Sequence, residues 1–379
     1  MQKLLLSALL FIHGFIHLIG FTAGFGLSDI KGFSGKTIIP LSATATKVLV
    51  ILWLLTFVLF LVAALGYILH RQWWWMFCGA AIVVSQLLII IYWKDAKAGT
   101  IANLLLVLPV LFAYGSYRFF NTAVTETKAM ISIPTASESI VTEDMLVHLP
   151  IAVKTWLRNS GIVGKPMTSR VYLKQRGKMC IKPGGTWMEA EAEQYFNINE
   201  PAFIWTVKVR MLPGVDMTGR DRFADGRGNM LIKVEGLYTF ADGKGDEIDQ
   251  GTMLRYLGEI CWFPSAALQP YIQWREIDTH TAEATMYYKG KSVSAIFHFD
   301  EKGRLISTAA KRYMGMGKDA ALQDWYIPCT EWKAFEGVTV PVKGNATWKL
   351  KEGDYDYYQW EITDLRYNGQ VPQQVKSIL

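Results

Sequence analysis

Two histidines one helical turn apart are the residues whose spacing offers chemistry most directly. His13 and His17 lie four positions apart in an apolar run, so both imidazoles project from one face if the run is a helix. Two imidazoles placed in this way can bind a metal or haem, or relay protons. No acidic or thiol partner lies at comparable depth in the other apolar runs, where Ser85 and Gln86 offer only hydrogen bonds. We therefore expect hydrogen bonds between helices and no cofactor, with His13 and His17 as the only metal candidates.

Side chains that act as acids or bases also occur after residue 120: Asp221, Glu259, Asp278, His280 and His298. None of them lies in a GxSxG or HExxH motif, and the chain has no Walker loop or dinucleotide fingerprint. His298 falls in a strand-like stretch, where a histidine usually packs against its neighbours. The sequence therefore favours a protein that is not an enzyme, and an enzyme of unknown class is an alternative.

A predicted helix over residues 251–263 carries side chains suited to ligand binding. Arg255 and Glu259 are four residues apart, which favours an ion pair along one helix face. An arginine at the mouth of an apolar hollow can also hold a phosphate or carboxylate. Trp262 and Trp274 are large enough to line such a hollow, although a tryptophan in a soluble domain is more often a core residue.

Four apolar runs precede these residues and predict membrane spans. They cover residues 4–24, 48–69, 73–93 and 101–117, each near the length that crosses the roughly 30 Å hydrocarbon core. The loops between the second, third and fourth runs are short, so neighbouring spans must be antiparallel. We predict a four-helix transmembrane domain over residues 1–118, a linker over 119–142 and a soluble domain over 143–379. The chain is thus expected to be a multi-pass protein of the cell membrane. Asn103, just inside the fourth run, is expected to help cap a helix end.

The charge distribution bears on partners and on orientation. Residues 1–120 hold 8 basic and 2 acidic side chains, and the remainder holds 31 of each. The soluble part therefore shows no basic excess for nucleic acid, whereas the loops suit a lipid bilayer. Five lysines (Lys31, Lys36, Lys47, Lys94 and Lys97) flank one side of the bundle, against Lys3, Arg71 and Arg118 on the other. The positive-inside rule then predicts an extracytoplasmic soluble domain, although Lys3 and the amino terminus favour the opposite orientation.

The soluble part alternates apolar and polar residues with period two from Val171 onward. Residues 187–196 and 203–211 are predicted antiparallel strands, and glycine-containing turns separate most further candidates. These further strands are expected at residues 229–240, 282–288, 293–300, 305–313, 330–335, 338–343, 345–350 and 357–367. A second helix is expected from Met145 to Leu157. The fold class is therefore a transmembrane bundle followed by an α+β domain, whose curved antiparallel sheet or open half-barrel is covered by helices.

Cysteine does not settle the compartment. Cys78 lies in the third apolar run, and Cys180, Cys261 and Cys329 follow without metal-ligand spacing. An odd number in the soluble part cannot pair fully, and we expect free or buried thiols, with one disulfide as the alternative.

Several short motifs of the soluble part resemble an uncharacterised bacterial family with a membrane-tethered domain. They include GRDRF at 219–223, GRG at 226–228, LRYLGE at 254–259 and WFP at 262–264, together with Trp274, Asp278, Arg312, Gly337 and Pro341. The fold of that family looks like the LolA/LolB-type lipoprotein carriers, an incomplete barrel with helices over an apolar cavity. The four spans resemble small DoxX-like membrane proteins through hydropathy and the segment 13–17. That likeness implies an inward N-terminus and so a cytoplasmic soluble domain, against the charge count.

These observations favour a membrane-anchored binding module for a lipid, fatty acid, acyl chain or lipoprotein. Its expected ligand-binding residues are Arg255, Glu259, Trp262, Trp274, Asp278 and Arg312. Buried methylenes contribute about 0.8 kcal/mol each, which makes an aromatic hollow beside a bilayer suited to acyl chains. The alternatives are a redox or transport protein that uses His13 and His17, and an enzyme in the soluble domain.

Overall fold

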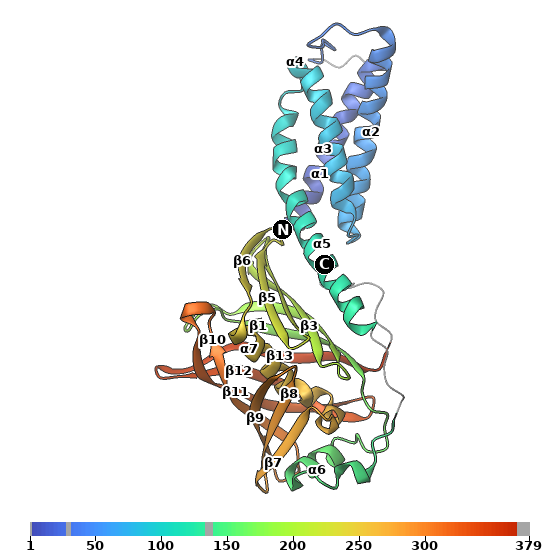
Figure 1. The fold of residues 1–379 in the computed structure, drawn as a ribbon. Coiled ribbons are helices and arrows are strands. Elements are labelled where there is room, and N and C mark those ends of the chain that lie inside the picture. Colours follow the sequence, from blue (N-terminus) through green and yellow to red (C-terminus); the bar gives the residue numbers. More distant parts are fainter. Residues whose placement is uncertain (1, 28–31, 133–138, 370–379) are drawn as a thin grey trace. The chain divides into compact units, whose positions relative to one another are not determined.

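The structure is a computed structural model that describes residues 2–27, 32–132 and 139–369 (Figure 1). Contacts divide the chain into two compact units. The first contains the helices up to Arg118 and the turn Glu235–Leu237, and the second contains the chain from Phe119 to Val234 and from Tyr238 onward.

Four long apolar helices are present, as predicted, and the first unit contains three of them and the fourth up to Arg118. They are α1 (Gln2–Gly24), α2 (Ala43–Ile68), α3 (Trp74–Ile91) and α5 (Gly99–Ile131), with the short α4 (Trp93–Ala96) between the last two. All four long helices are apolar and long enough to cross a membrane. Gly20 allows α1 to approach α2 closely, because a Cβ there would lie 2.4 Å from the Trp53 ring.

Helix α5 differs from the prediction in its length. The fourth apolar run was expected to end at Tyr117 and to be followed by a linker, but the helix continues without a break to Ile131. Met130 and Ile131 are buried in a cluster with Tyr172, Tyr195, Ala202 and Ile204 of the sheet. The first half of the expected linker is therefore a helix that belongs to the second unit and packs on its sheet. Residues 133–138 of that linker lie outside the described residues.

The second unit is built on one antiparallel sheet of 13 strands, which confirms the predicted fold class. The sheet order is β6-β5-β4-β3-β2-β1-β13-β12-β11-β10-β9-β8-β7, so β1 joins β13 and all other neighbours are consecutive in sequence. The strands are β1 (Arg170–Met179), β2 (Met188–Asn197), β3 (Ala202–Leu212), β4 (Val215–Ala224), β5 (Arg227–Val234), β6 (Tyr238–Gly243), β7 (Ile272–Asp278), β8 (Thr281–Tyr288), β9 (Lys291–Phe299), β10 (Leu305–Met314), β11 (Ala321–Phe335), β12 (Val338–Leu350) and β13 (Gly353–Tyr367).

The connection between the two edge strands covers the concave face of this sheet. It consists of α7 (Asp246–Glu259) and the short 3-10 turns η2 (Ile260–Trp262) and η3 (Pro264–Leu268). Helix α7 contacts β4 and β5 on one side and β9 and β10 on the other, and the sheet curls around it (Figure 1). The side chains at the centre of this contact are fully buried aromatics: Phe196, Phe203, Phe223, Tyr256 and Phe263. The half-barrel core is therefore formed by helix and sheet together.

Several predicted elements have different bounds in the structure. Residues 229–240 form a hairpin of β5 and β6 instead of one strand, because Glu235 and Gly236 adopt positive φ and reverse the chain. Residues 338–350 form one strand, β12, instead of two. Strands β1, β4 and β7 were not among the predicted strands, and each contains three or more charged side chains. The helix expected at 145–157 divides into η1 (Glu143–Leu146) and α6 (Ile151–Asn159).

Candidate functional site

A closed set of hydrogen bonds joins three helices inside the bundle. His13 Nε2 of α1 lies 2.8 Å from Asn103 Oδ1 of α5, and Asn103 Nδ2 donates to Ser85 Oγ of α3 at 3.0 Å. Ser85 Oγ lies 2.9 Å from His17 Nε2, and His17 Nδ1 lies 2.8 Å from the His13 carbonyl oxygen. All four side chains are at least 98 % buried. The hydrogen bonding between helices that the sequence predicts is therefore present.

These contacts fix the tautomer of each imidazole. A carbonyl oxygen only accepts, so His17 Nδ1 carries its proton and the Ser85 hydroxyl donates to His17 Nε2. By the same reasoning His13 donates from Nε2 to Asn103, which leaves His13 Nδ1 as a buried acceptor without a partner. Within the described residues no three His, Cys, Asp or Glu side chains come together as a metal site. The geometry thus shows two neutral imidazoles that link helices.

Asn103 is a residue whose place the sequence prediction missed. It was expected near a helix cap, but its side chain forms hydrogen bonds with His13 and Ser85. Its Nδ2 also donates to Gln86 Oε1, at 3.0 Å. Its depth in the fourth apolar run was the available signal, because an amide in hydrocarbon needs partners on another helix.

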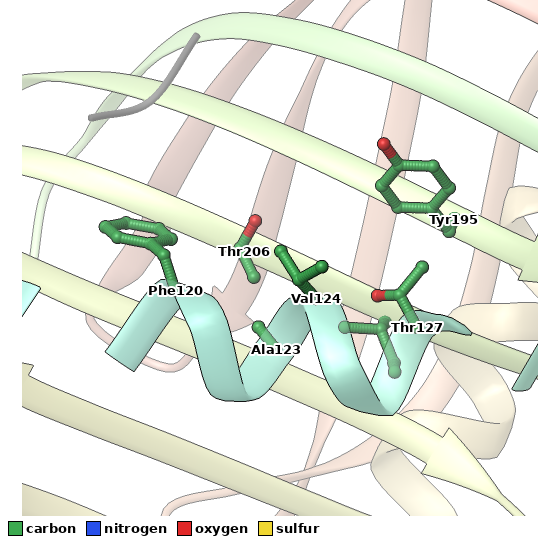
Figure 2. Close-up of a pocket in the computed structure, with 7 residues that line it drawn as sticks. Phe120, Ala123, Val124, Thr127, Tyr195 and Thr206 are labelled. Carbon is green, nitrogen blue, oxygen red and sulfur yellow. The ribbon is translucent and has the colours of Figure 1, made fainter. Parts of the chain in front are cut away.

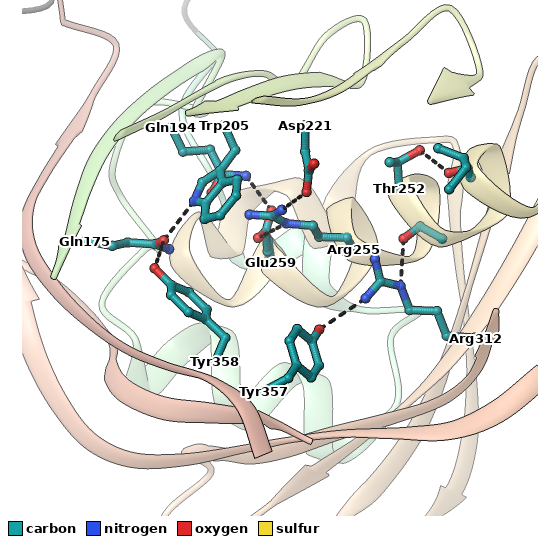
Figure 3. A network of polar contacts seen from close by, with 12 residues as sticks. Gln175, Gln194, Trp205, Asp221, Thr252, Arg255, Glu259, Arg312, Tyr357 and Tyr358 are labelled. Atoms are coloured by element: carbon teal, nitrogen blue, oxygen red, sulfur yellow. Dashed lines mark hydrogen bonds and ion pairs between the residues drawn. The ribbon is translucent and has the colours of Figure 1, made fainter. Parts of the chain in front are cut away.

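A second polar network lies on the concave face of the sheet and is centred on Arg255 of α7 (Figure 3). Its Nη1 donates to Asp221 of β4 at 2.7 Å, and its Nε donates to Glu259 at 2.7 Å. The guanidinium also stacks on the Trp205 ring, 4.5 Å from its centroid. Gln194 of β2 donates to the second Glu259 oxygen at 2.7 Å. Arg255 and Glu259 form the ion pair that their spacing predicts, and the partners from β2, β3 and β4 attach this pair to the sheet.

Burial and neighbouring charges shift the pKa values of the ionisable groups in this network. Burial raises the pKa of Glu259, against the opposing effects of Arg255 and Gln194. Burial also disfavours the charge on Arg255, but Glu259 and Asp221 outweigh it and hold the Arg255 pKa above its ordinary value. Two carboxylates therefore surround one guanidinium, which leaves Arg255 little capacity to hold a further anion.

Arg312 of β10 lies in the same face but has a different environment (Figure 3). Its Nε donates to the Gly251 carbonyl of α7 at 3.2 Å, and its Nη1 donates to the Tyr357 hydroxyl at 3.2 Å. Its guanidinium carbon lies 4.8 Å from the Trp325 ring centroid and 5.7 Å from that of Trp348. In the described part of the chain, no carboxylate lies within ion-pair distance of Arg312. This half-buried cation therefore has neutral partners only.

The other expected ligand-binding residues lie elsewhere. Trp262 of η2 is buried against Trp360, with 5.4 Å between ring centroids, and its Nε1 has no partner. Trp274 of β7 packs on Phe297 and donates to the Ala267 carbonyl at 2.9 Å. Asp278 is exposed at the end of β7, where the His280 backbone amide lowers its pKa. The structure therefore joins Arg255, Glu259 and Arg312 on one face, and places Trp262, Trp274 and Asp278 outside their contacts.

The candidate acids and bases also lie in separate places. Asp221 and Glu259 are held by Arg255, whereas Asp278 and His280 share an exposed turn. His298 is half-buried in β9 with its Nδ1 3.4 Å from the Thr281 hydroxyl. No imidazole lies beside the buried carboxylates in the contacts of the described residues. This arrangement offers no acid and base aimed at a common point.

A pocket of about 220 Å³, including its open mouth, lies on the opposite face of the sheet (Figure 2). The strand alternation places Gln194 and Trp205 toward α7, so their neighbours Tyr195, Ile204 and Thr206 face the other way. The last turns of α5 cover that convex face. The pocket lining is small and mostly apolar: Phe120, Ala123, Val124, Thr127, Tyr195, Ile204 and Thr206.

The concave face itself is filled by side chains. Tyr256, Leu257, Ile260 and Phe263 from the covering connection are all fully buried there. An open apolar hollow, which the resemblance implies, is thus occupied by α7 and the turns that follow it.

Two solved structures are similar to this chain. A domain from Vibrio parahaemolyticus assigned to outer membrane lipoprotein sorting is 8 % identical, with 54 % of this chain and 88 % of that chain covered, at a TM-score of 0.30. A DUF1329 family protein from Desulfovibrio piger is 8 % identical, with 61 % and 100 % covered, at a TM-score of 0.35. No curated protein matches the sequence. A family model described as a family of unknown function, DUF6544, matches residues 139–360, and the chain therefore belongs to the DUF6544 family.

Proposed function

We propose that this protein is a membrane-anchored, non-catalytic binding module for an amphipathic ligand with an anionic group, such as a lipid, a fatty acid or an acylated protein. One observation carries the proposal, namely the half-buried Arg312 cation on the concave face, which has no acidic partner among the residues that the structure describes. Removing a charge from water costs free energy that neutral partners return only in part. An anionic ligand oxygen would complete this site.

Arg312 and Arg255 have different roles in this proposal. Arg255 is neutralised by Asp221 and Glu259, so it holds α7 against the sheet. Arg312 has a planar guanidinium group, of which Nε donates to the Gly251 carbonyl and Nη1 donates to the Tyr357 hydroxyl. A guanidinium binds a carboxylate or phosphate through two parallel hydrogen bonds, which suits the headgroup of a lipid.

Aromatic side chains around Arg312 supply the apolar half of the site. Trp325 and Trp348 lie under its guanidinium, and Trp325 Nε1 donates to the Tyr357 hydroxyl at 3.0 Å. Trp348 and Tyr357 stack with 5.8 Å between ring centroids. Their faces can pack along the first methylenes of an acyl chain, each worth about 0.8 kcal/mol when buried.

An acyl chain longer than a few methylenes would need the space that α7 occupies. The helix is attached by Arg255 to β4 and by Gly251 to Arg312, and it carries a second ion pair between Asp249 and Lys291 of β9. We therefore propose that an acyl chain displaces part of α7. Trp262, in the turn η2 that follows α7, would then line the opened space. Polar attachments suit a helix that moves, because water can replace them once the contact opens.

The side of the membrane is also a proposal. The lysine count favours a domain outside the cytoplasm, where envelope lipids are the available ligands. Lys244 is exposed, and a Lys244→Cys variant labelled by a membrane-impermeant maleimide in intact cells tests this orientation. Labelling only after the cells are opened would place the domain inside.

Photocrosslinking tests the binding proposal. The full chain in nanodiscs would be irradiated with a diazirine fatty acid, and labelled peptides would be mapped by mass spectrometry. We expect labels on β10–β12 around Trp325 and Trp348 that excess unlabelled fatty acid removes. Arg312→Gln should reduce this labelling about tenfold or more, because a hydrogen bond to a charged group contributes about 1.5–3 kcal/mol.

Arg275→Gln is the matched control, since Arg275 is an exposed arginine on β7 whose partner is Glu283. It should leave the labelling unchanged. Labels confined to α1–α5, with the same yield in Arg312→Gln, would refute the proposed site.

A further inference from the structure

Exposed apolar side chains gather at one end of the sheet. Tyr238 and Phe240 of β6 are 70 % and 66 % exposed, and Leu237 in the turn before them is 41 % exposed. Leu212, at the end of β3, is 62 % exposed. Large apolar groups in this number on an edge strand are unfavourable in water and promote aggregation unless something covers them.

The strand register places these residues together. Leu212 pairs with Val215 beside the β3–β4 turn, and Met217 pairs with Val234 of β5. Val234 in turn pairs with Tyr238 of β6. The β3–β4 and β5–β6 turns therefore lie at the same end of the sheet, with Leu212 beside the first turn and Tyr238 beside the second.

This end of the sheet lies near the first residues of the part of α5 that belongs to the second unit. Phe119 and Phe120 of α5 are buried against Leu231 of β5. Phe119 follows the fourth apolar run by two residues, and Leu231 precedes Val234 by three, about 10 Å along a strand. These exposed side chains therefore lie at the same end of the second unit as Phe119 and Phe120, which follow the fourth apolar run closely in the chain.

We infer that the ends of the β3–β4 and β5–β6 hairpins rest in the interfacial layer of the bilayer that α5 spans. Tyrosine is suited to this layer because its ring is apolar and its hydroxyl remains hydrated, and Leu and Phe side chains bury apolar area there. The contact would hold one edge of the half-barrel at the lipid surface. This inference does not depend on the ligand of Arg312.

Site-directed spin labelling of the full chain in single-copy nanodiscs tests the contact. A nitroxide at Tyr238→Cys should relax faster with oxygen, which concentrates in lipid, than with a water-soluble nickel chelate. Ile277→Cys is the matched control, because Ile277 is 44 % exposed on β7, the other edge of the sheet. Its label should respond mainly to nickel. The native cysteines are buried, which limits background labelling.

Leu212→Cys provides a second reporter in case the Tyr238 variant does not fold. Nickel access at positions 212 and 238 equal to that at 277 would overturn the inference. A second result would also overturn the inference: dipolar broadening between labels at position 238 in discs that hold two copies, together with nickel access in single-copy discs. A second copy of the chain, instead of lipid, would then cover the exposed side chains. Arg312→Gln should leave the oxygen response at 238 unchanged, which separates this test from that of the proposed function.

Discussion

Arg255 of α7 stacks on Trp205 of β3, with 4.5 Å between the guanidinium carbon and the ring centroid. Trp205 is itself fixed, because its Nε1 donates to Gln175 at 3.0 Å and Gln175 also accepts from Tyr358 at 3.0 Å. The stacking therefore connects the covering helix to β1, β3 and β13. This connection explains why the proposed function assigns a structural role to Arg255 and the ligand to Arg312.

Replacing Arg255 tests its structural role. Arg255→Met keeps much of the side-chain volume but leaves Asp221 and Glu259 without their cation. We expect a loss of about 3–5 kcal/mol in the free energy of unfolding, the usual cost of breaking a buried ion pair. Near-UV circular dichroism during denaturation of the full chain would measure it. Arg275→Met removes an exposed pair and should cost less than about 1 kcal/mol, so equal losses would contradict the assigned role.

The raised pKa of Glu259 predicts a dependence of stability on pH. A carboxyl whose folded pKa exceeds its unfolded value stabilises the fold fully below the unfolded pKa, near 4.5, and this stability is lost as pH rises through the folded pKa. Glu259→Gln cannot ionise and should escape that loss. The difference in melting temperature between variant and wild type should therefore shift in favour of the variant as pH rises above 4.5.

Thermal melts in one detergent across pH 4–8 would follow this difference. Glu331→Gln, on the exposed part of β11, controls for the loss of any carboxylate. A difference that stays constant for Glu259→Gln, or that turns against it at higher pH, would rule out the assigned shift.

The hydrogen bonds of Asn103 predict a stability effect in the bundle. Asn103→Leu would remove the hydrogen bonds to His13 Nε2, Ser85 Oγ and Gln86 Oε1. Hydrogen bonds between membrane helices contribute roughly 0.6 kcal/mol on average and up to about 1.7, so we expect a loss of about 2 kcal/mol. Unfolding of the purified chain in detergent mixtures would measure it. Leu104→Ala is the control on the neighbouring, 66 % exposed position, and an Asn103→Leu effect no greater than that control would contradict the prediction.

The displacement of α7 can be tested by a reversible crosslink. A Cβ at Gly258 would lie 3.7 Å from the Thr308 hydroxyl of β10, close enough for a Gly258→Cys/Thr308→Cys disulfide. We expect the oxidised variant to lose fatty-acid crosslinking on β10–β12 and the reduced variant to regain it. Equal labelling in both states, with the disulfide verified by mass spectrometry, would show that α7 stays in place when the ligand binds.

The sequence alone determined the elements whose pattern is local. Four apolar runs predicted the four helices that are long and apolar enough to cross a membrane, since a spanning helix needs about 20 such residues. The i, i+4 spacing of Arg255 and Glu259 gave their ion pair. Period-two alternation gave most of the antiparallel strands, and with them the half-barrel class.

Only the tertiary structure decided which distant residues meet. Asp221 and Gln194 reach Arg255 and Glu259 because the sheet curls around α7, and no local spacing encodes that curvature. Strand β4 escaped prediction because its inward positions include Gly219 and Asp221, and the partner of Asp221 is the buried Arg255 of α7. The sequence also failed to predict that α5 continues beyond its apolar part. Its last turns look polar along the sequence, and they remain helical because Met130 and Ile131 are buried against the convex face of the sheet.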